Sequence, residues 1–290
     1  MIPEPRFESD YSPRQVAAAR RVLVDVSQVL ASFSDAIVVV GGWVPDLRLP
    51  DAEPEHVGSI DVDLALDAVK LGDGRYAEIV KLLLDTHRYR QGDKDFQLVA
   101  VVDLEDGESA VTVEVEFLAP SKVKLKKNRP KLVESFRVLQ FPACAAAFEN
   151  PAEFEIDGAM ISGATNRVRL RVASLSDFAI MKAHAIAGRD KPKDVYDLCF
   201  CLDRYPDGLE ALAADWRSRR GDSVVADAIR ILEEKFRRVD DFGPRQLAIF
   251  HGDDGADERA IHARRAFELV RSLLLMLSAP KSSLADMRPR

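Results

Sequence analysis

Three side chains that could do chemistry lie close together in the sequence: Ser59, Asp61 and Asp63. The segment from Ser59 to Leu66 alternates polar with apolar residues, a pattern that predicts a β-strand. Because side chains alternate across a strand, the serine and both aspartates share one face, with the carboxylates about 7 Å apart along the chain. Two such carboxylates repel each other unless a cation lies between them, and Mg²⁺, which prefers oxygen ligands, fits this arrangement.

A glycine pair precedes this strand. Gly41 and Gly42 follow the apolar segment 36–40, which is itself predicted to be a strand. Glycine allows a tight turn and a close approach of the backbone, so the amides of this turn could contact a phosphate. Trp43 follows and could stack on a base, but packing beneath the sheet is the simpler expectation. The glycines and the acids together indicate a site for a nucleoside triphosphate.

A site for phosphoryl or nucleotidyl transfer usually has a third carboxylate on a neighbouring strand, because two metal ions about 4 Å apart can hold the attacking and leaving oxygens. Residues 113–117 supply two candidates, Glu114 and Glu116, on one face of a predicted strand. We favour Glu116 because it is nearer the end of the strand. The alternative is that both glutamates form a solvent-exposed strand face.

A second group of charged residues lies further along the chain. Lys182 and Arg189 are seven residues apart and share a helix face, and Asp194 and Asp197 are three apart and share another. Lys193 adds a further cation. A cation on a helix beside the carboxylates could bind the triphosphate. Two surface helices joined by salt bridges are the alternative.

The remaining sequence predicts the elements that must position these residues. Helices are predicted at residues 13–33, 43–49 and 74–86, and strands at 36–40, 60–66, 96–103, 110–118, 153–162 and 167–173. The acidic turn around Gly107 indicates a hairpin, so part of the sheet is antiparallel. After Ser174 nearly every periodic segment is helical, at residues 175–187, 193–202, 208–217, 224–237 and 259–277. We therefore predict an α+β protein, with a mixed sheet and flanking helices in residues 1–173 and an all-helical domain in residues 174–290.

The composition limits the classes of function. A chain of 290 residues with a net charge of −7 is not expected to bind nucleic acid over its whole surface. A local basic segment could still follow an RNA backbone; it comprises Lys122, Lys124, Lys126, Lys127, Arg129 and Lys131. The alternative is a strand edge whose lysines prevent aggregation.

Other residue types suggest a reducing compartment and no membrane. Cys144, Cys199 and Cys201 show no paired metal spacing and are expected to be free thiols in the cytoplasm. The five histidines also lack metal-ligand spacing, and we expect structural or surface roles for them. Residues 1–13 are polar, unlike a signal peptide, and no apolar segment is long enough to cross a bilayer. The sequence thus predicts a cytoplasmic protein with no membrane partner.

The order of three motifs resembles the AbiEii/MenT group of nucleotidyltransferases, within the DNA polymerase β-like superfamily. The motifs are residues 39–43, residues 59–64, and the segment from Lys182 to Leu198, so the resemblance covers roughly residues 36–200. It implies a nucleotidyltransferase-like domain that moves a nucleotide from a nucleoside triphosphate and depends on Mg²⁺ or Mn²⁺. In toxin members of the group the acceptor is tRNA, and an antitoxin is the partner.

The resemblance also implies roles for particular residues. Gly41 and Gly42 would line the triphosphate, and Ser59 would touch it. Asp61 and Asp63 would hold the metal. The helical half would contribute two catalytic residues of the cleft, Lys182 and Asp194. From the residue pattern we add Glu116 as the third metal ligand and two nucleotide-binding cations, Lys182 and Arg189.

Some features depart from the family pattern and keep other functions open. Many members carry an arginine two residues before the serine, where this chain has Val57. The third acid is a glutamate instead of the more usual aspartate, and the gap from Gly42 to Asp61 is long. One alternative is an enzyme that modifies a small molecule, as the aminoglycoside-modifying relatives do. Another is a catalytically silent module that binds a nucleotide or a protein partner.

Overall fold

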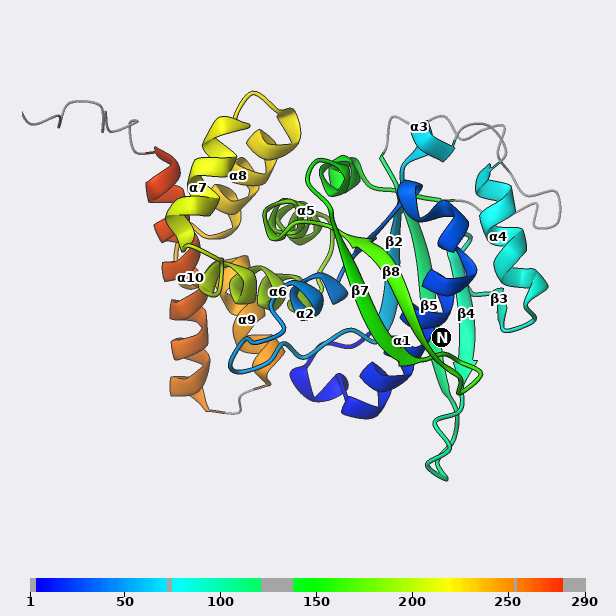
Figure 1. The fold of residues 1–290 in the computed structure, drawn as a ribbon. Helices are drawn as coiled ribbons and strands as arrows, with labels where there is room; N and C mark the ends of the chain where they lie inside the picture. Colours follow the sequence, from blue (N-terminus) through cyan, green and yellow to red (C-terminus); the bar gives the residue numbers. More distant parts are fainter. Residues whose placement is uncertain (1–3, 72–74, 121–137, 253–254, 279–290) are drawn as a thin grey trace, which may run out of the picture.

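The computed structural model describes residues 4–71, 75–120, 138–252 and 255–278. Of two adjacent strands near the centre of its sheet (Figure 1), the second carries the predicted acid pair. Strand β1 (Ile37–Val40) is a run of isoleucine and valine buried along its whole length, and β2 (Asp61–Leu66) alternates half-buried aspartates with buried apolar residues. The two strands pair antiparallel with Val40 opposite Asp63, which places Asp63 beside the turn that follows β1.

The sheet is mixed, as the sequence predicts. Its strand order is β3-β4-β5-β2-β1-β8-β7, and β6 pairs with β5 outside this path. The pairs β2–β5, β1–β8 and β5–β6 are parallel and the others antiparallel. The remaining strands are β3 (Tyr89–Gln91), β4 (Gln97–Val102), β5 (Val111–Ala119), β6 (Leu139–Gln140), β7 (Ala152–Ala159) and β8 (Thr165–Val172).

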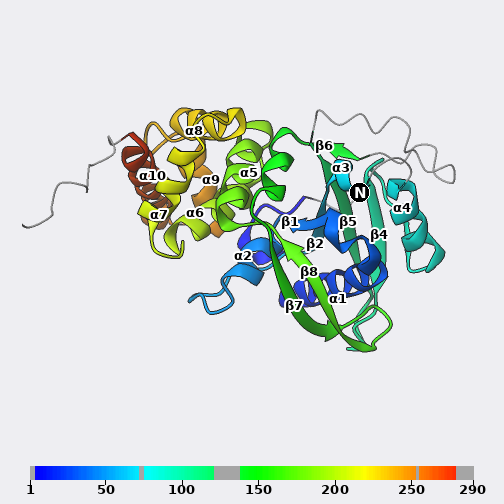
Figure 2. The same ribbon diagram turned by 45° about the horizontal axis from the view of Figure 1, so that its top comes forward.

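Helix α1 (Pro13–Val29) covers one face of this sheet. Ser12 caps the helix by accepting from the Gln15 amide, and Pro13 occupies the first turn, where no backbone donor is needed. Its buried side, which includes Val22, Leu23 and Val26, packs on β7, β8, β5 and β2 (Figure 2). The short helix α3 (Ala68–Leu71) packs against the 3₁₀ segment Ala31–Ala36, and α4 (Arg75–Asp85) packs against β3 and α1. The opposite sheet face is thereby left for the site.

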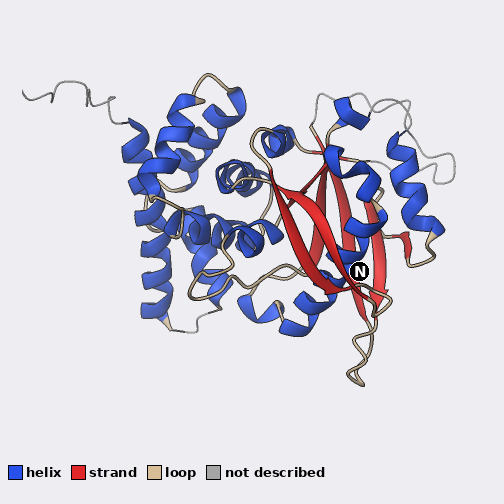
Figure 3. Ribbon diagram, in the orientation of Figure 1, coloured by secondary structure: helices blue, strands red, loops and turns tan. Residues whose placement is uncertain are grey.

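Helices dominate the chain after β8 (Figure 3). They are α5 (Leu175–Gly188), α6 (Pro192–Asp203), α7 (Leu209–Ser218), α8 (Ser223–Lys235), α9 (Phe242–His251) and α10 (Ala256–Ser278). Helix α5 is buried from Leu175 to Ala183 without interruption, because it packs on the sheet side and on the other helices at once. Helix α2 (Trp43–Arg48) and three 3₁₀ segments, Glu8–Asp10, Ala31–Ala36 and Pro142–Phe148, complete the described fold.

The predicted fold class is confirmed, with differences at particular elements. The change from strands to helices falls between Val172 and Leu175, as expected. Helix α9 was not predicted, and the first long helix ends at Val29 and is followed by a 3₁₀ segment instead of continuing to Phe33. The division into two domains stays a prediction; Tyr11, near the start of the chain, packs in the core of the helical half.

Two sequence predictions concern other parts of the chain. The basic segment from Lys122 to Lys131 lies outside the described residues. Among the helices that the structure describes, none combines the length and the apolar character needed to cross a membrane.

Candidate active site

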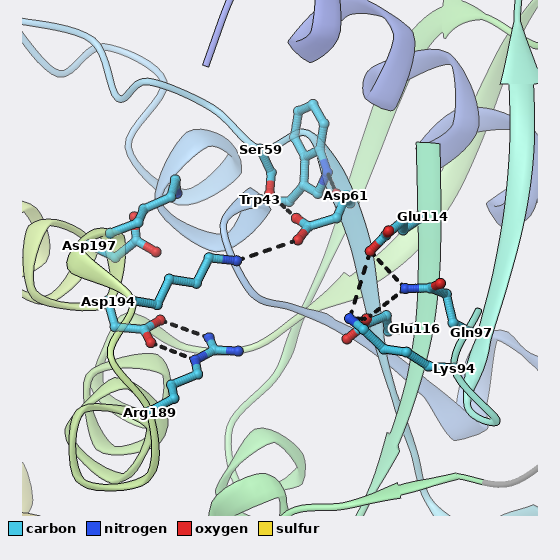
Figure 4. A network of polar contacts seen from close by, with 12 residues as sticks. Trp43, Ser59, Asp61, Lys94, Gln97, Glu114, Glu116, Arg189, Asp194 and Asp197 are labelled. Carbon is cyan, nitrogen blue, oxygen red and sulfur yellow. Dashed lines mark hydrogen bonds and ion pairs between the residues drawn. The ribbon is translucent and has the colours of Figure 1, made fainter. Parts of the chain in front are cut away.

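The acidic side chains gather on one face of the sheet. In the register between β2 and β5, Asp61 lies opposite Glu114, and Asp63 lies opposite Glu116. Residues opposite each other on paired strands point to the same side, so the four carboxylates share a face. Since α1 covers the other face, these acids point toward the helices α5 and α6 (Figure 4).

The glycine turn after β1 is required by the close approach of neighbouring side chains. Gly41 has a φ of +68°, and a Cβ there would lie 2.0 Å from Asp63 Oδ2. A Cβ on Gly42 would lie 2.6 Å from Ser59 Oγ and 2.9 Å from Lys193 Nζ. Both positions therefore need a residue without a side chain, which agrees with the predicted turn.

Asp61 is held through both its backbone and its carboxylate. Trp43, which is buried beneath the sheet as expected, donates from Nε1 to the carbonyl oxygen of Asp61 at 2.7 Å. Ser59 Oγ donates to Asp61 Oδ1 at 2.6 Å (Figure 4). Lys191 Nζ lies 3.9 Å from Asp61 Oδ2. Burial opposes the charged form, but Lys191 and Ser59 hold the pKa of Asp61 below its ordinary value, so this carboxylate is ionised at neutral pH.

Asp63 is in a different electrostatic environment from Asp61. Burial, followed by the charges of Asp61 and Glu116, raises the pKa of Asp63 to about 7. The group therefore changes charge close to neutral pH. A raised carboxylate pKa beside other acids is typical of a site that lacks a neutralising cation or one that works on protons.

The two glutamates of β5 contact side chains of β4 and of the turn that precedes it. Lys94 Nζ lies 2.7 Å from Glu116 Oε1 and 3.8 Å from Glu114 Oε2. Gln97 Nε2 donates to both carboxylates, at 3.0 Å to Glu116 and 2.7 Å to Glu114 (Figure 4). Only Glu116 of the two lies opposite Asp63 in the strand register. This position favours Glu116 as the third carboxylate, a role that stays a prediction.

Lys182 on α5 is at the centre of an ion network across from the acids. Its Nζ lies 2.8 Å from Asp194 Oδ1 and 2.7 Å from Asp197 Oδ2, both on α6. Burial opposes the ammonium charge, but the two carboxylates outweigh it and raise the pKa of Lys182. The lysine in turn lowers the pKa of Asp194 and Asp197 against the effect of burial. All three groups are therefore charged at neutral pH.

Two further cations complete this network. Arg189 donates from Nε and Nη2 to the two carboxylate oxygens of Asp194, at 2.7 Å and 2.9 Å (Figure 4). Lys193 Nζ lies 2.7 Å from Asp197 Oδ1. Such a bidentate guanidinium pair is rigid, and the half-exposed Arg189 side chain retains donors for a ligand. Lys182 and Arg189 both contact Asp194, but Arg189 follows the last residue of α5 in an extended conformation, so the two do not share a helix face as predicted.

The loop before β2 is joined to the same network. His56 Nε2 lies 2.9 Å from Asp197 Oδ1, and His56 Nδ1 accepts from the Gly58 amide at 3.1 Å. Burial lowers the pKa of His56 to about 4, so the neutral ring donates from Nε2 to the aspartate. The next residue, Val57, donates its amide to Tyr196 Oη at 3.2 Å. No cation comes from position 57, and His56 has the structural role expected of it.

The acids of the sheet and the cations from α5 and the loop after it line an open cavity of about 240 Å³. Its walls include five of the predicted site residues: Gly41, Asp63, Glu116, Lys182 and Arg189. The other four adjoin the walls through direct neighbours or hydrogen bonds: Gly42, Ser59, Asp61 and Asp194. The structure thus brings every predicted site residue into one region.

The carboxylates have the chemistry that a hard divalent cation requires. The negative charge of Asp61 contributes to the raised pKa of Asp63. A cation between the two carboxylates would relieve this repulsion. In the described part of the chain, no group of three or more histidine, cysteine, aspartate or glutamate side chains is arranged to hold a metal ion. Glu116 contacts Lys94 and Gln97 instead. Asp61 and Asp63 therefore have the donor chemistry that a cation needs, and Glu116 would have to exchange partners to join them.

Sequence reasoning did not identify several groups that contact the site. Lys191 approaches Asp61 from the loop between α5 and α6, and Lys94 and Gln97 hold the glutamates. Gln97 lies opposite Glu116 across the β4–β5 pair, so the predicted hairpin contained a signal for it. No local pattern pointed to Lys191, because its contact depends on how a helix loop packs beside the sheet.

An acidic wall with the chemistry for a divalent cation, opposite a wall of fixed cations, suits a polyphosphate substrate, and a mixed sheet with such a wall is compatible with a nucleotidyltransferase. The comparison with protein families agrees. A family model described as "Nucleotidyl transferase AbiEii toxin, Type IV TA system" matches residues 29–253, and the chain belongs to this family. It is therefore an enzyme of the nucleotidyltransferase type, from a family of toxins of type IV toxin–antitoxin systems.

Comparisons with individual proteins add little. No curated protein sequence matches the chain. A crystal structure of JHP933 from Helicobacter pylori matches at 13% sequence identity and a TM-score of 0.44, covering 92% of this chain and 94% of that chain.

Proposed function

We propose that this protein transfers a nucleoside monophosphate from a nucleoside triphosphate to RNA, with tRNA as the acceptor, and that it acts as a cytoplasmic toxin restrained by an antitoxin protein. In this reaction an acceptor oxygen forms a bond to the α-phosphorus, and the bond to the β-phosphate oxygen breaks to release pyrophosphate. The main observation in support is the single cavity with Asp63 and Glu116 on one wall and Lys182 and Arg189 on the other.

The triphosphate would lie between these walls. Gly41 and Gly42 leave the backbone of the turn open to it, and the Ser59 hydroxyl, which now donates to Asp61, is near enough to turn to a phosphate oxygen. Lys182 and Arg189 supply positive charge from the helical side, where Asp194 fixes both of them. Many family members carry an arginine where this chain has Val57, and we propose that Lys182 and Arg189 supply the positive charge in its place.

Asp61 and Asp63 would hold Mg²⁺ or Mn²⁺, with Glu116 as the third ligand. The ion, when bound, would neutralise the polyphosphate and the departing pyrophosphate. Lys191 now lies near Asp61, where a cation would replace part of its electrostatic role. The protein's own part is to position the donor, to hold the carboxylates close together and to keep the phosphates fixed against Lys182.

RNA is the proposed acceptor on the evidence of the sequence and the family. The basic segment from Lys122 to Lys131 follows shortly after β5, the strand that carries Glu116, so it starts close to the site in the chain. Membership of a toxin family favours a macromolecular acceptor whose modification stops growth. A small-molecule acceptor and a silent binding module are treated as outcomes of the test.

The test is a transfer assay with each of the four nucleoside triphosphates, labelled at the α-phosphate, in the presence of Mg²⁺ and purified tRNA. We expect label on the tRNA, and we expect Asp61→Asn and Asp63→Asn to reduce it by about a hundredfold or more, as loss of a charge-stabilising group does elsewhere. Asp157→Asn is the matched control, because Asp157 is an exposed aspartate on β7 that contacts only Arg167 among its ion pairs. It should change the rate by less than about twofold.

Other outcomes separate the alternatives. Label that appears on an aminoglycoside but never on RNA would identify a small-molecule enzyme. Bound nucleotide with no transfer to any acceptor would indicate a silent module. Growth arrest on expression that Asp63→Asn abolishes, and that a co-expressed neighbouring gene relieves, would support the toxin role.

A further inference from the structure

The turn between β3 and β4 brings a lysine, Lys94, to the acidic face of the sheet. Its Nζ donates to Glu116 Oε1 at 2.7 Å and lies 3.8 Å from Glu114 Oε2. The same ammonium lies 5.6 Å from the centre of the Phe96 ring. Glu116 is the proposed third ligand of the metal, so this carboxylate has two cations that could pair with it, the lysine and the metal ion.

A neutral side chain next to Lys94 can hold Glu116 without it. Gln97 is only 1% exposed, and its Nε2 donates to Glu116 Oε1 at 3.0 Å and to Glu114 Oε2 at 2.7 Å. Gly92 leaves room for this amide, because a Cβ there would lie 2.4 Å from Gln97 Oε1. The Lys94 side chain, by contrast, is 50% exposed. Gln97 therefore fixes the orientation of Glu116, and Lys94 adds a charge that can leave at a small cost in free energy.

Glu114 offers the ammonium a second partner on the same strand. It lies two residues before Glu116 on β5 and shares its face of the sheet. Its Oε2 is already 3.8 Å from Lys94 Nζ. Because lysine carries its charge on a flexible four-carbon stem, a small rotation exchanges one carboxylate for the other. Lys94 can therefore leave Glu116 and still be paired.

We propose that Lys94 is a displaceable counter-ion, which competes with the divalent cation for Glu116 and moves to Glu114 when that cation binds. This inference rests on the proposed function, in which Asp61, Asp63 and Glu116 hold the metal. An ammonium and a divalent cation repel each other at one carboxylate, so the free energy of the Lys94–Glu116 pair opposes metal binding. Lys94 thereby lowers the affinity of the site for the metal.

The experiment measures the affinity of the full chain for Mn²⁺, without nucleotide or RNA, from the electron paramagnetic resonance signal of the free ion. Lys94→Gln removes the competing charge and should tighten Mn²⁺ binding by about fivefold, the effect of one ion pair at the upper end of the range for exposed pairs. Lys94→Arg keeps the charge and should leave the affinity within about twofold of the original.

Arg90→Gln is the matched control for a general loss of positive charge. Arg90 is an exposed cation on β3 and lies opposite Val99, which in turn lies opposite Glu114, so it shares the acidic face two strands away. At roughly 10 Å from the glutamates its charge is largely screened by salt. This variant should change the affinity for Mn²⁺ by less than about twofold.

A double-mutant cycle tests whether Lys94 acts through Glu116. In Glu116→Gln the shared carboxylate is gone, so adding Lys94→Gln should no longer change the affinity for Mn²⁺. Thermal unfolding gives a second measurement. At the same Mn²⁺ concentration, the ion should raise the Tm of Lys94→Gln by more than it raises the Tm of the original protein, because tighter binding stabilises the folded state further.

The outcomes distinguish this inference from the proposed function. Unchanged Mn²⁺ binding in Lys94→Gln overturns the inference, and weaker binding does so by showing that the lysine orients Glu116 as a ligand. Equal tightening in Arg90→Gln, an effect of Lys94→Gln that persists in Glu116→Gln, or no Mn²⁺ binding by any of the proteins also contradicts it. Tighter binding in Lys94→Gln without transfer to any acceptor overturns the proposed function and leaves the inference standing.

Discussion

Asp63 is the residue whose charge most directly sets the properties of the cleft. Burial, followed by the charges of Asp61 and Glu116, raises the pKa of its carboxyl to about 7. Asp61, two residues earlier on the same strand, stays ionised because Ser59 and Lys191 stabilise its charge. Two chemically identical side chains thus differ in charge near neutral pH because of their neighbours.

This difference predicts a pH dependence for Mg²⁺ binding. A metal ligand must be deprotonated, and Asp63 is mostly protonated below its pKa of about 7. The affinity for Mg²⁺ should therefore fall by about tenfold per unit as the pH drops below 7 and stay nearly constant above it. Calorimetric titration with Mg²⁺ between pH 5.5 and 8.5 measures this. Asp63→Asn should remove the dependence, and a slope that persists in that variant would show that another group titrates.

A second prediction concerns Gly41, for which Gly163 is a matched control. Gly41 and Gly163 both have positive φ, +68° and +82°, but a Cβ meets Asp63 only at Gly41 and meets nothing within 4 Å at Gly163. Alanine at either position should lower the free energy of unfolding by about 1–2 kcal/mol through the left-handed backbone. Gly41→Ala should also abolish transfer, whereas Gly163→Ala should keep it, as assayed on tRNA after urea titration of both variants. Equal activity of the two variants would contradict the close approach at Asp63.

Several site residues could be predicted from the sequence because their geometry is local. The period of two placed Asp61 and Asp63 on one face, and the same rule paired Glu114 with Glu116. Helical spacing predicted that Lys182 and Arg189 lie together, and both contact Asp194, although Arg189 follows the last residue of α5. The contacts of Lys191 and Lys94 could not be predicted, because each depends on the packing of segments that are distant in the sequence.

At the scale of elements, α6 determines the cationic wall. Asp197 is fully buried and contacts Lys182, Lys193 and His56, three groups from three segments. The network holds α5, α6 and the loop before β2 in fixed positions. One helix position thereby joins α5, α6 and the loop that leads to Ser59.

Loss of this aspartate should be costly. Asp197→Asn leaves Lys182 and Lys193 with less opposing charge in a buried place, so we expect the free energy of unfolding to fall by about 3 kcal/mol or more. Asp203→Asn, at the half-exposed end of the same helix, where Arg204 and Arg265 bind it, should cost less than about 1 kcal/mol. Chemical denaturation of both variants measures the difference, and similar losses would mean that the network adds little stability.

Helix α9 shows why one element escaped prediction. Its sequence begins with Phe242, Gly243 and Pro244, which together are typical of a turn. The proline lies in the first turn, where its missing amide has no partner to lose. The glycine is needed because the Phe236 ring lies 2.4 Å from where its Cβ would be. That contact comes from tertiary packing, so the local sequence could not reveal it.

For the whole molecule, α5 connects two hydrophobic cores. Phe178 and Met181 pack in the core of the sheet, while Ala179, Ile180 and Ala183 pack in the core of the helical half. The predicted boundary near residue 173 marks a change of secondary structure, but the helix that follows it belongs to both sides. The two halves are therefore expected to unfold together.

The three thiols can test this expectation. Burial raises the pKa of Cys144 and Cys199 to about 12, and also raises that of Cys201, so all should react slowly with iodoacetamide in the native protein. Cys144 and Cys201 lie in the core of the sheet and Cys199 in that of the helical half. All three should become reactive at the same urea concentration, as followed by mass spectrometry of the peptides. Alkylation of Cys199 at a lower concentration would show that the helical half unfolds on its own.

A helix shared in this way also bears on how substrates come and go. If the sheet rotated against the helices, α5 would lose its packing on one side. The hydrophobic packing of α5 in both cores therefore opposes a rotation of one half against the other. Entry and exit of substrates would then depend on side chains that change partners, such as the half-exposed Arg189 in the cavity wall. We therefore expect release of pyrophosphate past Arg189, and not a rotation of one half, to limit the rate of turnover.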